Sequence, residues 1–290
     1  MNTADHPRLR CGARAPLAAL LTVVLAAACG EHRFGPPARD TASTAAAAPT
    51  GPADSLTITG DFQTPESVLH DSVADIYLVS NIHGGPLDRD DNGFISRVTP
   101  AGQVAELRWI DGARPEVTLH APKGLALKGD TLFVADIDTV RLFHRGTGAP
   151  LGARGVPGAT FLNDVAVGPD GTVYVTDSGL RAGAQGFEPT GTDAVWRFGP
   201  DGRPRPLRRG APLERPNGIV ATEDGVVVVM FGSNKVLRLD GQGNVAATDS
   251  VPADQLDGVV RLADGSLLVS SWEGRAVYHL VPGQGAMPLV

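Results

Sequence analysis

One sequence pattern recurs five times along the chain, and this repetition limits the possible folds more than any other feature. In each copy a polar residue precedes an apolar run, a turn and a second apolar run, and two shorter runs follow. The clearest copies are FLNDVAVGPDGTVYVTD (161–177), RPNGIVATEDGVVVVMF (215–231) and QLDGVVRLADGSLLVSSW (255–272). A shortened copy, APKGLALKGDTLFVADID (121–138), and a divergent one, PESVLHDSVADIYLVSN (65–81), precede them.

The repeat predicts an all-β protein, because short apolar runs bounded by Asp-Gly and Gly-rich turns are typical of strands in hairpins. Repeats of four strands every ~40–50 residues are typical of a β-propeller. A β-sandwich is the alternative fold, but it would not explain the repetition. We therefore expect residues 55–290 to form a propeller with five clear four-stranded repeats.

The N-terminal segment has the features of an export signal. Residues 1–28 contain three arginines followed by an apolar run, which ends in Ala-Ala-Ala before Cys29. The run is shorter than the roughly 20 residues of a membrane span. The ending LAAAC resembles a bacterial lipobox, so we expect Cys29 to be lipidated and residues 29–54, rich in Ala, Pro and Thr, to form a flexible tether. The protein is then an exported lipoprotein, periplasmic or at the cell surface, that contacts the membrane through its lipid anchor only. Ordinary cleavage, giving a secreted or periplasmic protein, is the alternative.

Charge and motif content exclude several classes of function. The formal net charge is −7, which argues against a nucleic-acid-binding surface. Only Cys11 and Cys29 are present, so the cleaved chain has no internal disulfide. A serine-hydrolase reading has no support, because no G-x-S-x-G motif occurs.

The polar residue at the start of each repeat defines a candidate site. A propeller brings equivalent positions of its blades together around one axis, so these starting positions should converge: Glu66, Lys123, Asn163, Asn217 and Asp257. Two carboxylates and two amide oxygens in this set suit a hard divalent cation, Ca²⁺ or Mg²⁺ before Mn²⁺ or Zn²⁺. The alternative is that Asn and Asp simply favour the turns that lead into strands.

The chain resembles the family of regucalcin (senescence marker protein), gluconolactonase and luciferin-regenerating enzyme, as an exported bacterial member. The resemblance runs from about Leu56 onward and rests on Pro65-Glu66-Ser67, Leu162-Asn163-Asp164, Pro216-Asn217-Gly218 and Leu256-Asp257-Gly258. It implies a six-bladed propeller with one divalent metal, Ca²⁺ first, held by Glu66, Asn163, Asn217 and Asp257. It also implies that Asp257 is the general base of a lactone hydrolase.

Two features depart from that family. Phe161 stands two residues before Asn163, where sugar-lactone hydrolases carry an Arg that holds the substrate, so we expect a less polar ligand. The chain also ends soon after the fifth repeat, and residues 51–64 could add only one strand. We therefore expect an incomplete sixth blade and an incompletely closed ring, with closure by five blades as the alternative.

These observations predict an exported, metal-dependent lactonase or esterase acting on a small lactone or ester. Asp257 would deprotonate water, Asp164 would orient water or substrate, and Lys123 would pair with a substrate anion or with a carboxylate such as Glu66. The rival prediction is a non-catalytic propeller that holds a small molecule or a protein partner at the same site.

A weaker motif, residues 88–93, matches half of a calcium loop. Two long loops, 81–92 and 177–193, are expected to surround the site.

Overall fold

The computed structural model describes residues 56–184 and 186–289, and these residues form strands and turns without a helix. The N-terminal signal, the tether and Cys29 lie outside the described residues, so the predictions made for them are not tested. No helix in the described ranges could span a membrane. The strands build five four-stranded antiparallel sheets, which confirms the prediction of an all-β propeller with five clear blades.

Each blade is a sheet whose first strand is innermost. Blade 1 contains β1 (Pro65–Asp71), β2 (Ile76–Asn81), β3 (Phe94–Val98) and β4 (Val104–Asp111). Blade 2 contains β5 (Pro122–Lys128), β6 (Thr131–Asp136), β7 (Thr139–His144) and β8 (Pro150–Gly155). Blade 3 contains β9 (Leu162–Val167), β10 (Val173–Asp177), β13 (Ala194–Phe198) and β14 (Pro204–Arg209). Blade 4 contains β15 (Pro216–Ala221), β16 (Gly225–Met230), β17 (Lys235–Asp240) and β18 (Val245–Ser250). Blade 5 contains β19 (Leu256–Arg261), β20 (Leu267–Ser271), β21 (Ala276–Val281) and β22 (Gly285–Pro288).

The Asp-Gly turns predicted from the sequence connect the first and second strands. In blade 3, Asp170 accepts a hydrogen bond of 2.8 Å from the backbone N–H of Thr172, and Gly171 has a φ of 81°. A residue with a Cβ would be strained in this left-handed conformation, which explains the glycine.

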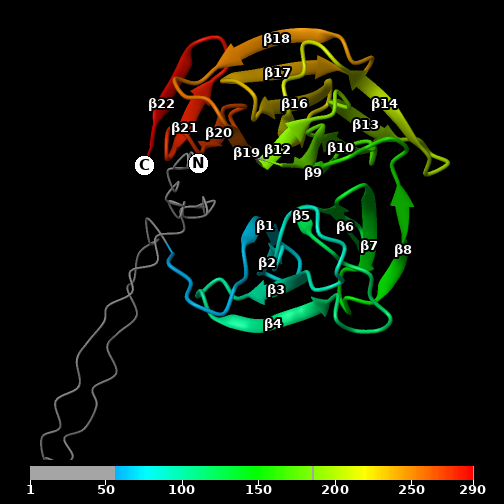
Figure 1. Cartoon of the computed structure of the whole chain (residues 1–290). Helices are drawn as coiled ribbons and strands as arrows, with labels where there is room; N and C mark the ends of the chain where they lie inside the picture. The colour runs from blue at the N-terminus through cyan, green and yellow to red at the C-terminus, as the bar shows by residue number, and fades with distance from the viewer. Residues whose placement is uncertain (1–55, 185, 290) are drawn as a thin grey trace, which may run out of the picture.

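Four apolar clusters hold consecutive blades together, one at each junction from blade 1 to blade 5. Figure 1 shows the blades arranged around an axis with an opening between the first and the last. The inner strands β1, β5, β9, β15 and β19 pack against one another in this order, but β19 and β1 do not pack together as the others do. Accordingly, Val68 on β1 is 64% exposed and Val260 on β19 is 57% exposed.

The ring of described residues is therefore open, which confirms the expectation of an incompletely closed propeller. The five blades do not close on one another, so the five-bladed closed ring is wrong. The additional strand considered for residues 51–64 does not form in its described part, since residues 56–64 contain no strand.

An ion pair ties blade 1 to blade 2. The guanidinium of Arg145, in the turn after β7, donates from Nε to Oδ2 of Asp71 at 2.8 Å and from a second nitrogen to Oδ1. The hydrogen bond from Arg145 lowers the pKa of Asp71 to about 2, although burial opposes the shift. The pair fixes the end of β1 opposite to the end that carries Glu66.

Blade 3 contains the long loop predicted at 177–193, and this loop includes a hairpin that the sequence did not reveal. The loop between β10 and β13 forms its own two-stranded sheet, β11 (Leu180–Gly183) paired with β12 (Gly186–Pro189). The other blades have no such hairpin in the part of the chain that the structure describes.

Candidate functional site

The predicted polar residues occupy one equivalent position in all five blades. Each is the second residue of its innermost strand: Glu66, Lys123, Asn163, Asn217 and Asp257. Because neighbouring inner strands pack together, this end of the strands brings the five side chains to one end of the propeller axis. We call these five residues the axial site.

A β-bulge places each axial-site residue. In every blade the pairing of the first two strands shifts between the first and fourth residues of the inner strand, so two residues face one partner. In blade 1, for example, Glu66 and Ser67 face Ser80. A bulge interrupts the regular ladder and redirects a side chain, and bulges are frequent next to active sites.

Hydroxyl groups satisfy the backbone of three bulges. The N–H groups of Ser67, Asp164 and Gly258 donate to hydroxyl oxygens at 2.9, 3.0 and 2.8 Å, respectively. The acceptors belong to the residue opposite each bulge: Ser80, Thr176 and Ser270. A Ser or Thr near the end of the second apolar run was the sequence signal for this arrangement, and the sequence analysis missed it.

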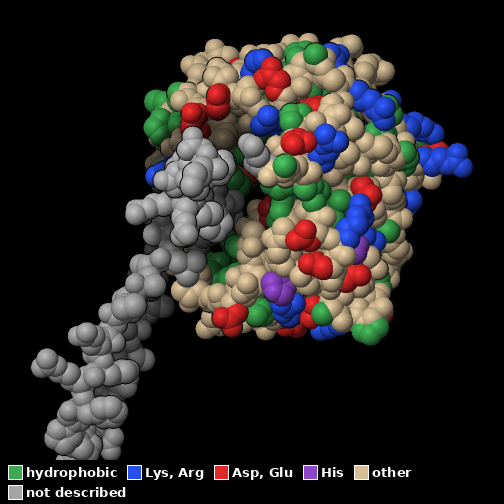
Figure 2. Space-filling model, in the orientation of Figure 1, with side chains coloured by type: hydrophobic (Ala, Val, Ile, Leu, Met, Phe, Trp, Pro, Cys, Tyr) green, Lys and Arg blue, Asp and Glu red, His purple; other side chains and the backbone are tan. Residues whose placement is uncertain are grey.

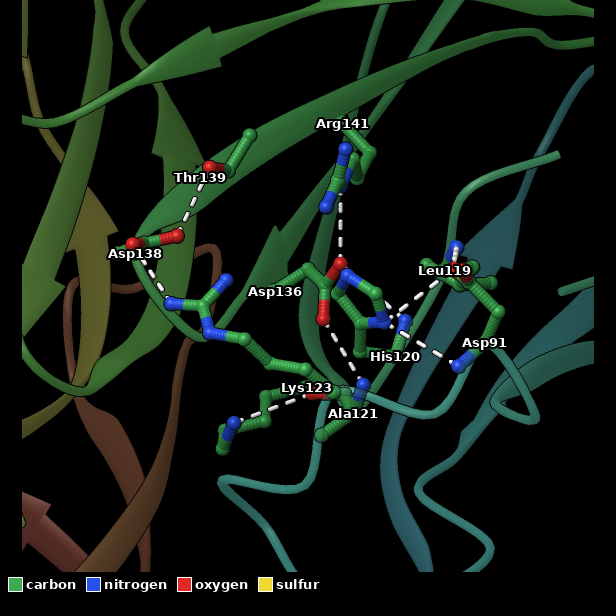
Figure 3. Close-up of polar contacts among 10 residues, drawn as sticks. Asp91, Leu119, His120, Ala121, Lys123, Asp136, Asp138, Thr139 and Arg141 are labelled. Carbon is green, nitrogen blue, oxygen red and sulfur yellow. Dashed lines mark hydrogen bonds and ion pairs between the residues drawn. The ribbon is translucent and has the colours of Figure 1, made fainter.

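Buried polar side chains also fix the loops that lead into the inner strands. In blade 3, Oδ1 of Asp177 accepts a hydrogen bond of 2.9 Å from the N–H of Phe161. In blade 2, Asp136 accepts bonds from the N–H of Ala121 at 2.8 Å and from Nε of Arg141 at 2.9 Å. Figure 3 shows this second network, with Lys123 beside it. These acidic residues at the ends of second strands were also not anticipated.

Asn163 and Asn217 have their amide nitrogens engaged within the protein. Nδ2 of Asn163 donates to Oγ of Ser178 at 3.2 Å, and Nδ2 of Asn217 donates to Oδ1 of Asp257 at 3.0 Å. Ser178 in turn donates to the carbonyl of Pro216 at 2.8 Å, which joins blade 3 to blade 4. These bonds fix the orientation of both amide groups. Their carbonyl oxygens remain available to accept a hydrogen bond or to bind a metal.

Asp257 has both carboxylate oxygens held by side chains. Oδ1 accepts the bond from Asn217, and Oδ2 accepts one of 3.0 Å from Nε1 of Trp272. Burial raises the pKa of the Asp257 carboxyl, whereas the bonds from Trp272 and Asn217 oppose this shift. The carboxylate is thus oriented without being neutralised by a cationic side chain within 4 Å among the described residues.

Glu66 lies in the field of other charges. Burial raises the pKa of its carboxyl well above the usual value, and the negative charges of Asp257 and Asp164 raise it further, whereas Lys123 lowers it. These long-range effects show that side chains from four blades are electrostatically close. The described residues provide Glu66 with no ion pair within 4 Å, so the alternative of a direct Lys123–Glu66 salt bridge is not met.

Lys123 is buried and donates to backbone oxygens. Its Nζ lies 2.9 Å from the carbonyl of Pro86 and 3.1 Å from that of Ala121, and 4.6 Å from the ring centroid of Phe161. Burial lowers the pKa of Lys123 to about 8, while the charges of Glu66 and Asp136 oppose the shift. The bond to Pro86 also shows that the loop 82–93 reaches the site, as expected.

Asp164 connects three blades. Its Oδ2 accepts a hydrogen bond of 2.9 Å from the N–H of Ile219 in blade 4, and its Oδ1 accepts one of 2.8 Å from Val165. Burial raises the pKa of Asp164 to about 7, and the charge of Asp257 adds to the effect. Gly124 in blade 2 faces the Asp164 carboxylate and backbone so closely that a Cβ would overlap them.

Two aromatic pairs border the axial site. Phe231 and Trp272 directly follow the second strands of blades 4 and 5, and their ring centroids lie 5.5 Å apart in a T-shaped contact. Phe161 contacts Phe187, on the inserted strand β12, in the same manner at 5.8 Å. Phe187 brings the loop 177–193 to the site, as predicted. Figure 2 shows hydrophobic side chains beside the central opening, in the region of β9 and β12.

The donor set fits the metal that the family resemblance implies. Amide oxygens and carboxylates are hard ligands suited to Ca²⁺ or Mg²⁺, and a divalent cation would neutralise carboxylates that burial otherwise penalises. No group of three or more His, Cys, Asp or Glu side chains in the described residues is arranged to hold a metal. The fit therefore depends on the amides of Asn163 and Asn217.

The acidic loop 88–93 has internal partners for its side chains. Oδ2 of Asp88 accepts a bond of 2.9 Å from the N–H of Gly85, and Asn92 donates to Asp90 at 2.6 Å. Asp91 accepts a bond of 3.1 Å from the N–H of Leu119. These contacts stabilise the loop, and no group of three His, Cys, Asp or Glu side chains in the described residues is arranged there to hold a metal.

A separate cavity lies away from the axial site. It measures about 940 Å³ and is lined by the turns Pro169–Thr172, Gly199–Gly202 and Thr222–Gly225, which lie at the opposite ends of the strands from the axial site. The convergence of equivalent positions, rather than cavity size, identifies the candidate site.

Comparisons with known proteins support the fold. No family model matches the sequence, and no curated protein matches it. Among solved structures, a catalytically inactive variant of virginiamycin B lyase from Staphylococcus aureus, determined with quinupristin, has a TM-score of 0.55 at 14% identity, covering 80% of this chain and 71% of the other. A protein named as a candidate gluconolactonase has a TM-score of 0.54 at 19% identity, covering 79% and 78%. A streptogramin B lyase has a TM-score of 0.53 at 12% identity, covering 79% and 84%. At these identities the likeness is one of fold.

Proposed function

We propose that the protein is an exported, metal-dependent hydrolase that opens a small lactone or cleaves an ester. The observation that carries this proposal is the Asp257 carboxylate, oriented at both oxygens by Asn217 and Trp272 and lying at the same strand position as Glu66 and Asn163. A fixed carboxylate next to further oxygen ligands is what a metal-assisted hydrolase requires.

Four residues would hold one divalent cation, with Ca²⁺ preferred over Mg²⁺, Mn²⁺ and Zn²⁺: Glu66, Asn163, Asn217 and Asp257. When bound, the cation would polarise the carbonyl group of the substrate. The bonds from Asn163 to Ser178 and from Asn217 to Asp257 favour this assignment, because they engage the amide nitrogens and leave the amide oxygens to act as metal ligands.

Asp257 would act as the general base. It accepts a proton from a water molecule whose oxygen attacks the carbonyl carbon, and it returns that proton to the leaving alkoxide when the ester bond breaks. The bonds to both carboxylate oxygens hold the base in one orientation, which reduces the cost of reaching the reactive geometry. Proteins of this fold that are named as a virginiamycin B lyase and as a candidate gluconolactonase are in line with a propeller of the hydrolase or lyase type.

The other predicted residues would contact the substrate. Lys123 supplies a positive charge at the axial site for an anionic substrate group or for the product carboxylate. Phe161 supplies an apolar wall where a sugar-lactone hydrolase carries Arg. Asp164 would orient water or substrate while its carboxylate links the inner strands.

A substrate panel tests this function. The full-length protein would be treated with EDTA, supplied with CaCl2, and assayed on γ-butyrolactone, γ-phenyl-γ-butyrolactone, glucono-δ-lactone and p-nitrophenyl acetate. We expect hydrolysis of at least one compound, loss of activity after chelation and recovery with calcium. Asp257→Ala should reduce the rate about 10²- to 10⁴-fold, the usual contribution of a positioned general base. Full activity in this variant would overturn the assignment of the base.

The open ring favours a second candidate function. Catalysis depends on tight positioning, and blades 1 and 5 are not restrained by a junction like the other four among the described residues. A non-catalytic protein could use the axial site to hold a small molecule or a protein partner. Calcium and lactone binding without turnover of any compound in the panel would support this alternative.

Export and lipidation form a separate part of the proposal. Cys29 would carry the lipid, and residues 29–54 would separate the propeller from the membrane. Metabolic labelling with a fatty-acid analogue tests this, with Cys29→Ser as the matched control. Labelling that persists in this variant would contradict lipidation at Cys29.

A further inference from the structure

Two aromatic side chains at the axial site are unusually exposed. Trp272 is 37% exposed and Phe187 is 52% exposed, and they are the only aromatic members among the exposed large hydrophobic residues of the described chain. The other two tryptophans are buried, with Trp109 at 7% and Trp196 at 3%. In the described residues, the large exposed aromatic rings are therefore confined to this site. Their exposure here marks a surface for an apolar ligand.

Each exposed ring is supported by a second aromatic ring. The planes of Trp272 and Phe231 meet at 88°, and those of Phe187 and Phe161 meet at 86°. Edge-to-face contacts of this kind hold a ring in place and leave part of its surface free for a ligand. The first pair belongs to blades 4 and 5, and the second belongs to blade 3, so the pairs lie beside Asn217–Asp257 and Asn163 respectively.

The surfaces of these four aromatic rings are almost entirely apolar. The indole N–H of Trp272 is the single polar hydrogen of the four rings, and it is used in the bond to Asp257. A sugar would bring several hydroxyl groups to this surface and would lose hydrogen bonds to water there. An aromatic or bulky aliphatic group would instead replace water on the exposed rings.

The hairpin that carries Phe187 has no counterpart in the other described blades. Its strands β11 and β12 are joined by an exposed ion pair of 3.1 Å between Arg181 and Glu188, next to Phe187. The hairpin brings one large apolar side chain, Phe187, to the axial site.

We propose that the Trp272–Phe231 and Phe187–Phe161 pairs form an aromatic clamp that selects lactones or esters bearing an aromatic or bulky apolar substituent. This inference rests on the proposed function for the chemistry of the carbonyl group. It adds the substrate class, and it assigns Phe187 and Trp272 as specificity-determining residues.

Binding measurements separate the clamp from catalysis. Calorimetric titration of the full-length, EDTA-treated protein would compare γ-phenyl-γ-butyrolactone with γ-butyrolactone, since removal of the metal prevents turnover if the reaction depends on it and leaves the four aromatic side chains unchanged. We expect the phenyl compound to bind at least about 10-fold more tightly. The Phe187→Ala substitution should weaken its binding about 3- to 10-fold and change that of γ-butyrolactone less than about 2-fold, as expected for the loss of one aromatic contact.

Leu151→Ala is the matched control, because Leu151 is also 52% exposed but lies on the outer strand β8. It should change neither dissociation constant. Equal affinity for the two lactones, no detectable binding of the phenyl compound, or an equal loss for both lactones in Phe187→Ala would overturn the clamp. Tight, Phe187-dependent binding in a protein that hydrolyses nothing would support the clamp and reject the hydrolase. Hydrolysis of the lactones without preference for the phenyl compound would support the hydrolase and reject the clamp.

Discussion

The indole nitrogen of Trp272 lies 3.0 Å from Oδ2 of Asp257, and the bond joins an exposed aromatic ring to the proposed general base. The two residues come from adjacent strands of blade 5, one at the start of β19 and one directly after β20. This relationship couples recognition of an apolar substrate to the orientation of the carboxylate. It gives Trp272 two separable roles, one carried by its ring and one by its N–H group.

Trp272→Phe separates these roles, because it keeps an aromatic ring and removes the donor. Loss of a hydrogen bond to a charged group costs about 1.5–3 kcal/mol, so we expect kcat to fall about 10- to 100-fold. KM for γ-phenyl-γ-butyrolactone should change less than about 3-fold. Trp272→Ala removes both features and should impair kcat and KM together. An unchanged kcat in Trp272→Phe would show that the bond to Asp257 has no positioning role.

Asn163→Ala tests the amide ligands without any activity assay. The substitution removes a proposed metal oxygen, so we expect calcium affinity, measured by calorimetry on the full-length protein, to fall at least about 10-fold. Asp88→Asn is the matched control, because Asp88 begins the calcium-like sequence of the loop 88–93. If Asp88→Asn abolished calcium binding and Asn163→Ala did not, the metal would be bound by the loop.

The ion pair between Asp71 and Arg145 predicts how stability depends on pH. The pKa of Asp71 is about 2 in the folded protein, below its ordinary value of 3.8. A lowered carboxyl pKa adds stability that is fully present above pH about 4 and is lost as the pH falls toward 2. For this largely buried carboxyl the shift corresponds to about 2 kcal/mol.

Asp71→Asn should therefore lower the free energy of unfolding by about 2 kcal/mol at pH 6, and the difference from the unchanged protein should vanish near pH 2. Urea unfolding at several pH values measures this difference. Asp75→Asn is the control, because Asp75 is in the same turn but its side chain is 74% exposed. A constant difference across this pH range would mean that Asp71 contributes through packing alone.

Gly124→Ala tests the close contact between blades 2 and 3. The added Cβ would overlap the carboxylate and backbone of Asp164, so we expect a loss of about 1–3 kcal/mol in unfolding free energy. Gly155→Ala provides the comparison, because a Cβ at Gly155 meets no atom within 4 Å. Equal stability of the two variants would show that the blades separate easily at this point.

The sequence repeat was sufficient to predict the propeller and its five clear four-stranded blades, whereas the open ring was expected only from the resemblance to six-bladed propellers. The repeat also placed Glu66, Asn163, Asn217 and Asp257 in phase, because each is the second residue of an inner strand. Periodicity carries this information directly: equivalent residues of repeated blades occupy equivalent places around the axis.

Other features of the site depend on contacts between distant residues. The bulges at the axial site arise from the pairing register of two strands, which no single strand specifies. The hairpin β11–β12 lies in a Gly-rich segment with few large apolar residues, so it resembles an ordinary loop in the sequence. The approach of Phe187 to Phe161, and of Trp272 to Asp257, becomes apparent only once the blades are folded.

The most direct test of the account is a crystal structure of the full-length protein grown with CaCl2, with the metal located by anomalous scattering. We expect one calcium ion at the axial site, with oxygens of Glu66, Asn163, Asn217 and Asp257 at about 2.3–2.6 Å. A calcium ion held by the loop 88–93 instead, or an axial site without metal at saturating calcium, would contradict the proposed metal centre.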